Sequence, residues 1–117
     1  MRPLSGPSAG AGHSILQPLK WRQIIPHESN RPGPRSGAAS VIHNDSLYIL
    51  GGYGGNGRLD DVWRYGFSSE QWQCLAVRGT TPQGRENNSS ILYKGKLYIF
   101  GGYSGQIWMN DFHSLDL

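Results

Sequence analysis

An internal repeat of fifty residues constrains this chain more than any other feature of its sequence. Residues 31–67 align with residues 81–117 without a gap when the sequence is shifted by fifty positions. Identical residues match along the whole unit: Pro32 and Pro82, Arg35 and Arg85, Gly51-Gly52-Tyr53 and Gly101-Gly102-Tyr103, Asp61 and Asp111. A tryptophan stands before each unit, Trp21 and Trp72, with one residue of offset. A period of this length indicates structural units that stack against one another.

Each unit has the sequence pattern of short strands joined by tight turns. Its first β-prone run is followed by a turn, Asn44-Asp45 in one unit and Lys94-Gly95 in the other. The next run is continuously apolar, which predicts a strand covered on both faces, and we expect the following Gly-Gly pair to end it. No segment shows an apolar stripe of helical period. We expect strands at 39–43, 47–50, 61–65 and 71–77 in the first unit, and at 89–93, 97–100 and 111–115 in the second.

These elements, in this order, resemble the kelch repeat. The resemblance rests on the arginine after proline, the run Leu-Tyr-Ile-Leu/Phe-Gly-Gly-Tyr, the strand that begins with Asp61 or Asp111, and the tryptophan that opens the fourth strand. It covers about residues 20–117. It implies an all-β fold, a fragment of a kelch-type β-propeller built from four-stranded antiparallel blades. It further implies that the first strand of each blade is innermost and the tryptophan strand outermost.

The repeat also predicts the organisation of the chain. Residues 1–20 are rich in Gly, Pro, Ser and Ala and are predicted to be a disordered leader. Residues 21–30 are expected to supply the outer strand of a preceding blade, residues 31–80 a first blade, and residues 81–117 a second blade that lacks its fourth strand. Two blades alone would expose apolar faces and open edges. We therefore expect further blades or self-association, and favour a truncated or fragmentary product over self-assembly.

The charge distribution argues against binding to nucleic acid. The net charge is +3, but residues 1–35 hold five basic residues against one acid, and residues 36–117 hold six against seven. The repeat region is thus nearly neutral and lacks a basic stripe. No run approaches the about 20 apolar residues of a membrane helix, so we expect no membrane partner. The single cysteine, Cys74, fits a reducing compartment, so we expect a cytoplasmic location, with a nuclear one as the alternative.

No pattern in the sequence predicts catalysis. Gly52–Gly57 matches G-x-G-x-x-G in form, but a strand-like run follows it, where a dinucleotide site needs a helix. The histidines lack zinc-site spacing, and no nucleophile–base pair recurs. Asp61 and Asp111 are expected to hydrogen-bond turn amides, and Cys74 to be a small buried filler. We therefore predict no catalytic residue, no metal, no cofactor and no enzymatic activity.

The predicted binding face is a set of loops on the rigid scaffold. In kelch substrate receptors, which this chain resembles, contacts come from the residue after Gly-Gly and from those after the arginine. Packing is the alternative role for the two tyrosines, and Trp108, expected in a loop, is either a binding anchor or a lid over the blade edge. Arg35 and Arg85 are expected to pin loop carbonyls. The candidate partner-binding residues are Tyr53, Tyr103, Ser36, Glu86, Asn87, Asn56, Arg58, Gln106 and Trp108.

The resemblance implies a module for protein–protein interaction, so the expected partner is another protein. The finer role that it suggests is substrate recognition for a ubiquitin ligase. The alternatives are an actin-binding or cytoskeletal scaffold, and a non-catalytic kelch appendage of an enzyme.

Overall fold

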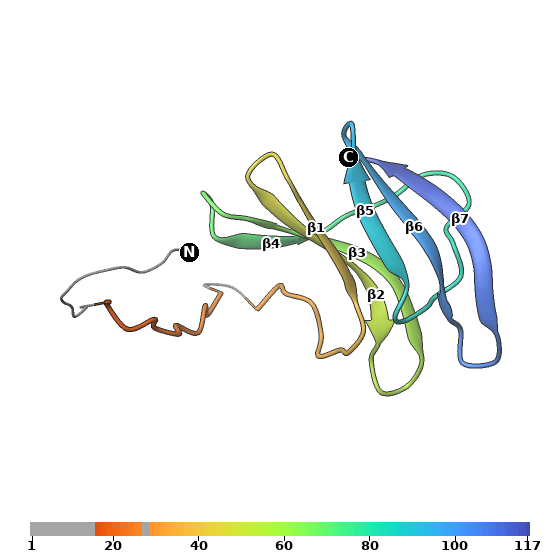
Figure 1. Ribbon diagram of the computed structural model, residues 1–117, viewed down its shortest axis with the longest axis horizontal. Helices are drawn as coiled ribbons and strands as arrows, with labels where there is room; N and C mark the ends of the chain where they lie inside the picture. Colours follow the sequence, from red (N-terminus) through yellow and green to blue (C-terminus); the bar gives the residue numbers. More distant parts are fainter. Residues whose placement is uncertain (1–15, 27–28) are drawn as a thin grey trace, which may run out of the picture.

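Two antiparallel β-sheets stand side by side in the computed structural model, which describes residues 16–26 and 29–117 (Figure 1). Those residues contain no helix, and hence none that could cross a membrane. The chain is all-β over these residues and forms two antiparallel blades, as predicted. The first sheet has the order β1 (Ala39–His43), β2 (Ser46–Tyr53), β3 (Arg58–Gly66) and β4 (Gln71–Cys74), and the second has β5 (Ser89–Tyr93), β6 (Lys96–Tyr103) and β7 (Trp108–Asp116).

The fifty-residue repeat reappears in the strand register. Ala39 pairs with Leu50 in the first sheet, and their counterparts Ser89 and Phe100 pair in the second. The β1–β2 turn places Asn44 and Asp45 at φ 45° and 62°, while the β5–β6 turn places Lys94 and Gly95 at 50° and 76°. Two successive positive φ values define the tight turn that matches the twist of a hairpin. Both predicted turns are therefore confirmed.

The Gly-Gly pairs do not end the second strands, and this prediction was wrong. β2 and β6 continue to Tyr53 and Tyr103, with a shift in register at each glycine pair. Gly51 and Gly52 have φ values of 67° and 103°, which side chains rarely adopt. A Cβ on Gly51 would lie 2.9 Å from the Arg85 carbonyl oxygen. The glycines thus form a β-bulge within a continuing strand.

The two sheets pack through one face of each. Leu97 and Ile99 of β6 are buried against the first sheet, whereas their counterparts Leu47 and Ile49 are only half-buried. A cavity of about 90 Å³ between the sheets is lined by side chains from both, including Leu50 and Val62 of the first sheet. β1 and β5 lie next to each other (Figure 1). This agrees with the implied innermost position of the first strand in each blade.

The segment before the first blade has no regular structure in its described residues, and its assignment to a preceding blade stays a prediction. The expected outer strand at 21–30 is not formed in its described residues, 21–26 and 29–30. A strand needs a neighbouring strand for its backbone hydrogen bonds, and no described residue pairs with this segment. Of the predicted leader, residues 1–15 lie outside the described residues. Residues 16–20 are exposed and have no regular structure, and the blade boundaries stay predictions.

Cys74 is exposed rather than buried. It ends β4 and pairs with Trp63 of β3, so both side chains lie on the same face of the first sheet. That face is opposite the one that packs on the second sheet. The prediction of a buried filler was wrong because it assumed that every blade face is covered.

Candidate functional site

One arginine–carboxylate pair in each blade holds the entry of its first strand in place. The Arg35 guanidinium donates to both Asp61 oxygens at 2.7 and 3.1 Å and to the Gly51 carbonyl at 3.1 Å. Arg85 donates to both Asp111 oxygens at 2.7 Å and to the Gly101 carbonyl at 3.0 Å. Arg35 Nε also donates to the Gly33 carbonyl at 3.1 Å, and Arg85 Nε to the Gln83 carbonyl at 3.0 Å, so the predicted contact of each arginine with a loop carbonyl is confirmed. The predicted role of the aspartates was wrong, because their carboxylates accept the arginine fork, a geometry that side chains far apart in sequence provide.

The arginine partners lower the pKa values of the two aspartate carboxyl groups. Partial burial of Asp61 disfavours its charged form, but hydrogen bonds from Arg35 and Trp63 outweigh burial and lower its pKa. Hydrogen bonding from Arg85 is the largest influence on Asp111; it outweighs burial and, together with His113, holds the pKa of Asp111 well below its ordinary value. Both carboxylates are therefore ionised at neutral pH, and each fixes the bulged end of a second strand.

Backbone hydrogen bonds bring the loops to one end of both sheets. Ser36 exchanges two with Tyr53, at 3.1 and 2.8 Å, and Glu86 exchanges two with Tyr103, at 3.1 and 2.9 Å. Figure 1 shows the β2–β3 and β6–β7 turns at the same end of the molecule. Bonds also cross between the sheets, from the Gly52 amide to the Arg85 carbonyl at 2.8 Å. The predicted gathering of these loops is therefore observed.

Arg58 joins the two blades at this end. Its Nε donates to Glu86 Oε2 at 2.6 Å. Its guanidinium carbon lies 4.6 Å from the centre of the Tyr53 ring and 5.1 Å from that of Tyr103. A cation over an aromatic face is attracted by the electron-rich ring. The rings of two successive blades thus share one arginine, and we call Tyr53, Arg58, Glu86 and Tyr103 the arginine clasp.

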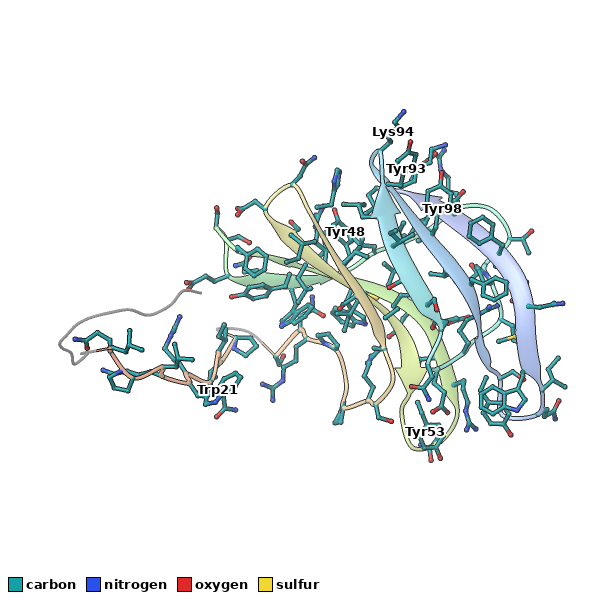
Figure 2. All side chains as sticks on the ribbon, viewed as in Figure 1. Trp21, Tyr48, Tyr53, Tyr93, Lys94 and Tyr98 are labelled. Atoms are coloured by element: carbon teal, nitrogen blue, oxygen red, sulfur yellow. The ribbon has the colours of Figure 1, made fainter. Side chains whose placement is uncertain are left out.

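The two tyrosines are half-buried, and their hydroxyl groups bond within their own loops. Tyr53 donates to the Gly55 carbonyl at 2.8 Å and Tyr103 to the Gly105 carbonyl at 3.0 Å. Figure 2 labels Tyr53 at the end of the β2–β3 loop. These bonds fix the ring positions and leave part of each ring accessible. The tyrosines therefore both pack against their loops and present surface.

Trp108 is not in a loop, contrary to prediction, because it is the first residue of β7. It pairs with Tyr103 across the two strands, and their ring centroids are 4.7 Å apart. Its side chain is 77% exposed. Cross-strand aromatic pairs stabilise sheets, so Trp108 extends the aromatic surface beside the arginine clasp without covering it.

The remaining candidates occupy the rim of the same end. Asn56 and Gln106 are exposed at the two loop tips, and a shallow hollow beside Asn56 is lined by Gly54, Gly57, Arg58 and Leu59. The Asn87 amide donates to the Gly37 carbonyl of the first blade at 2.9 Å. The sequence reasoning named Arg58 and Glu86 but missed their ion pair. Their counterparts in the repeat, Trp108 and Ser36, are uncharged, so the repeat carried no signal for it.

Within residues 16–26 and 29–117, no three His, Cys, Asp or Glu side chains are grouped to hold a metal ion. The chemistry of this end of the molecule is aromatic, amide and guanidinium surface, which suits hydrogen bonding and stacking.

Comparison with known proteins finds the same repeat elsewhere. Residues 14–117 match the KLHDC2/KLHL20/DRC7 Kelch-repeats domain. A dynein alpha chain of the flagellar outer arm of Chlamydomonas reinhardtii is 32% identical over 65 residues, 55% of this chain and 1% of that protein. Human host cell factor 1 is 33% identical over 70 residues, 60% of this chain and 3% of that protein. Human leucine-zipper-like transcriptional regulator 1 is 34% identical over 58 residues, which are 47% of this chain and 7% of that protein. The chain thus spans a small part of the length of these relatives.

Proposed function

The chain belongs to the kelch-repeat family, and from that premise we propose that it is a non-catalytic protein-binding module whose ligand contacts the arginine clasp. The observation that carries this proposal is the position of Arg58, between the rings of Tyr53 and Tyr103 and bonded to Glu86. This arrangement joins two blades into one preformed surface. Tyrosine and arginine are the residue types that most often dominate the energy of protein interfaces.

The clasp leaves donors for a ligand. Arg58 uses Nε for Glu86, and neither Nη1 nor Nη2 makes a hydrogen bond to a described residue. Its side chain is 26% exposed. Two guanidinium donors beside accessible tyrosine faces fit the carbonyl or carboxylate oxygens of an extended peptide. Asn56, Gln106 and Trp108 surround this surface and would make the outer contacts.

Selection of peptides on the protein tests this proposal. Peptides chosen from a random displayed library should bind the wild type and lose about tenfold or more in affinity with Arg58→Gln, or with Tyr53→Ala and Tyr103→Ala combined. Arg64→Gln is the matched control, because Arg64 bonds Gln73 on β3–β4, away from the clasp. Far-UV circular dichroism checks the fold of each variant. Selected peptides that bind all variants alike would refute the proposal.

For the cellular role we propose substrate recognition for a ubiquitin ligase, supported by the family resemblance and by a site suited to peptides. The similarity to a flagellar dynein chain supports a second candidate, a cytoskeletal scaffold. Co-precipitation from cells separates the two, since a ligase role predicts recovery of ligase subunits and a scaffold role predicts actin or microtubule proteins. Arg58→Gln should release substrate in the first case while the ligase subunits remain bound.

A further inference from the structure

The tip of the β2–β3 loop carries an Asn-Gly pair that the second blade lacks. Asn56 is followed by Gly57, whereas their counterparts fifty residues later are Gln106 and Ile107. Asn56 is exposed, and its loop lies at one end of the first sheet (Figure 1). A Cβ built on Gly57 would meet no atom within 4 Å, so open space lies beside this residue. The two loop tips therefore differ at the same place in the repeat.

The backbone nitrogen at the second position of this pair also differs between the loops. In the second loop the Ile107 amide donates to Ser104 Oγ at 3.2 Å. The counterpart of Ser104 is Gly54, which has no side chain, and among the described residues none accepts a hydrogen bond from the Gly57 amide. The Gly57 carbonyl, in contrast, accepts from the Gly54 amide at 3.0 Å and closes the loop. The Gly57 nitrogen is therefore available for chemistry.

An exposed Asn-Gly pair is reactive on elementary chemical grounds. The nitrogen of the residue after an asparagine attacks the side-chain amide carbon, Cγ, and closes a five-membered succinimide ring. A side chain on that following residue hinders the approach, and glycine has none. Glutamine has to close a six-membered ring, which is slower. The differences between the two loops at positions 54, 56 and 57 all favour ring closure in the first blade.

From these observations we propose that Asn56 is a site of spontaneous deamidation. The Gly57 nitrogen forms a bond to Asn56 Cγ and gives up its proton, and the side-chain nitrogen leaves as ammonia. Water then opens the succinimide at one of its two carbonyl carbons, which yields aspartate or isoaspartate at this position. In sum, one amide and one water become one carboxylic acid and one ammonia, without an oxidant or a reductant. An exposed carboxyl group of this kind is ionised at neutral pH, so the reaction adds a negative charge.

The new charge would lie beside the arginine clasp. Asn56 and Arg58 line the same shallow hollow. Glu86 holds the Arg58 guanidinium through Nε at 2.6 Å, and neither Nη1 nor Nη2 makes a hydrogen bond to a described residue. A second carboxylate near this cation competes with Glu86 and can accept from the donors left for a ligand. The reaction and its effect on Arg58 stand independently of the proposed function, and only the loss of ligand affinity rests on it.

Peptide mapping of the whole folded chain tests the reaction. After incubation at mildly alkaline pH in water labelled with heavy oxygen, Asn56 should be converted and carry the label. Asn44, also exposed but followed by Asp45, is the internal reference and should carry much less. Gly57→Val should slow labelling about tenfold or more, because a branched side chain hinders the attack and the loop has room for it. An unlabelled Asn56, or equal labelling in Gly57→Val, would overturn the proposal.

Gly54→Ser separates the influence of the loop structure from that of the Asn-Gly pair. It supplies the hydroxyl group that binds the Ile107 amide in the second loop, so it should slow labelling of Asn56 severalfold. A Cβ at this position meets only the side chain of Leu59, at 3.1 Å, and that side chain can rotate. Ser104→Gly is the matched control and should leave the labelling of Asn56 unchanged. Labelling at the wild-type rate in Gly54→Ser would refute the role given to the free nitrogen.

Asn56→Asp tests the effect on the clasp without the reaction. The Nε–H resonance of Arg58 in nitrogen–proton NMR spectra should shift, since the new carboxylate competes for this guanidinium. Asn44→Asp adds the same charge in the β1–β2 turn, at the other end of the sheet, and should leave that resonance in place (Figure 1). An equal shift in both variants, or none in either, would overturn the coupling to the clasp. Peptides selected on the wild type should bind Asn56→Asp more weakly, and failure to select any peptide would refute the proposed function alone.

Discussion

The two blades share a sequence pattern and a hydrogen-bond pattern, yet they differ in what covers them. Arg35 and Arg85 make the same fork to Asp61 and Asp111, and both glycine pairs form the same bulge. Arg85, however, is 2% exposed, and its backbone bonds both Gly52 and Leu59 of the first blade. The comparison teaches that the repeat determines each blade internally, whereas the neighbouring blade determines burial. The same residue should therefore contribute more to the free energy of unfolding where it lies at the boundary between blades.

Removal of the two arginines tests this most strongly. Arg85→Ala should lower the free energy of unfolding by about 2–4 kcal/mol, because it removes the bonds to Asp111 and to the Gly101 carbonyl and leaves a cavity where the arginine side chain was buried. Arg35→Ala, which lacks the contacts to a second blade, should cost about 1–3 kcal/mol. Urea denaturation measures both. Equal losses of stability in the two variants would show that contacts across the blade boundary contribute nothing to the stabilisation by Arg85.

The bulge glycines give the next largest contrast. A Cβ on Gly51 would meet Arg85 O at 2.9 Å and Leu59 O at 3.1 Å, whereas one on Gly101 would meet Met109 O at 3.0 Å within its own hairpin. Alanine at either position must adopt the positive φ of the glycine that it replaces, which costs about 1–2 kcal/mol of stability. Gly51→Ala should cost about 1–3 kcal/mol more, because the second blade must also move. Thermal melts of both variants, with Gly55→Ala as a control for φ alone, measure the difference.

Acid should weaken both blades through their carboxylates. The pKa values of Asp61 and Asp111 are lower in the folded chain than in the unfolded one. Their stabilisation is therefore complete above the unfolded pKa of about 4 and is lost as the pH falls toward the folded values. The melting temperature should drop below about pH 4. Asp111→Asn should lower the melting temperature at pH 7 more than Asp61→Asn does. It should also leave the melting temperature less sensitive to acid. The opposite order of the two variants would contradict the larger lowering of the Asp111 pKa.

The smallest expected contrast concerns the tyrosine hydroxyls. Tyr103→Phe should cost about 1 kcal/mol, because its bond to Gly105 is part-buried, and Tyr53→Phe about half of that, because its bond to Gly55 is exposed. Neither change removes the ring beside Arg58. Chemical denaturation measures the stability, and a larger loss for Tyr53 would mean that exposure does not set the value of these bonds.

Local sequence predicted most of the strands and turns because these elements depend on neighbouring residues, whereas the bulges at the two Gly-Gly pairs were not predicted. The turns at Asn44-Asp45 and Lys94-Gly95, and the gathering of the loops at one end, follow from patterns that recur at fifty residues. Exposure was predicted less well. Cys74 and segment 21–25 were placed by assuming neighbours that the described chain does not bring to them.

The pairings across the blades escaped prediction for a different reason. Arg58 and Glu86 are 28 residues apart and occupy positions whose repeat counterparts, Trp108 and Ser36, carry no charge. The forks to Asp61 and Asp111 do recur, but a carboxylate near a turn has many local partners, so recurrence alone did not identify the arginine.

Ligand binding at the arginine clasp, as proposed, would be thermodynamically coupled to the stacking of the two blades. Tyr53 and Arg58 belong to one blade and Glu86 and Tyr103 to the next, so the angle between the blades sets the spacing of the ring pair. A ligand that requires this spacing must increase the free energy needed to separate the two blades. The increase must grow with the fraction of clasp sites that the ligand occupies. By the same linkage, any change that loosens the blade boundary must weaken the ligand without touching it.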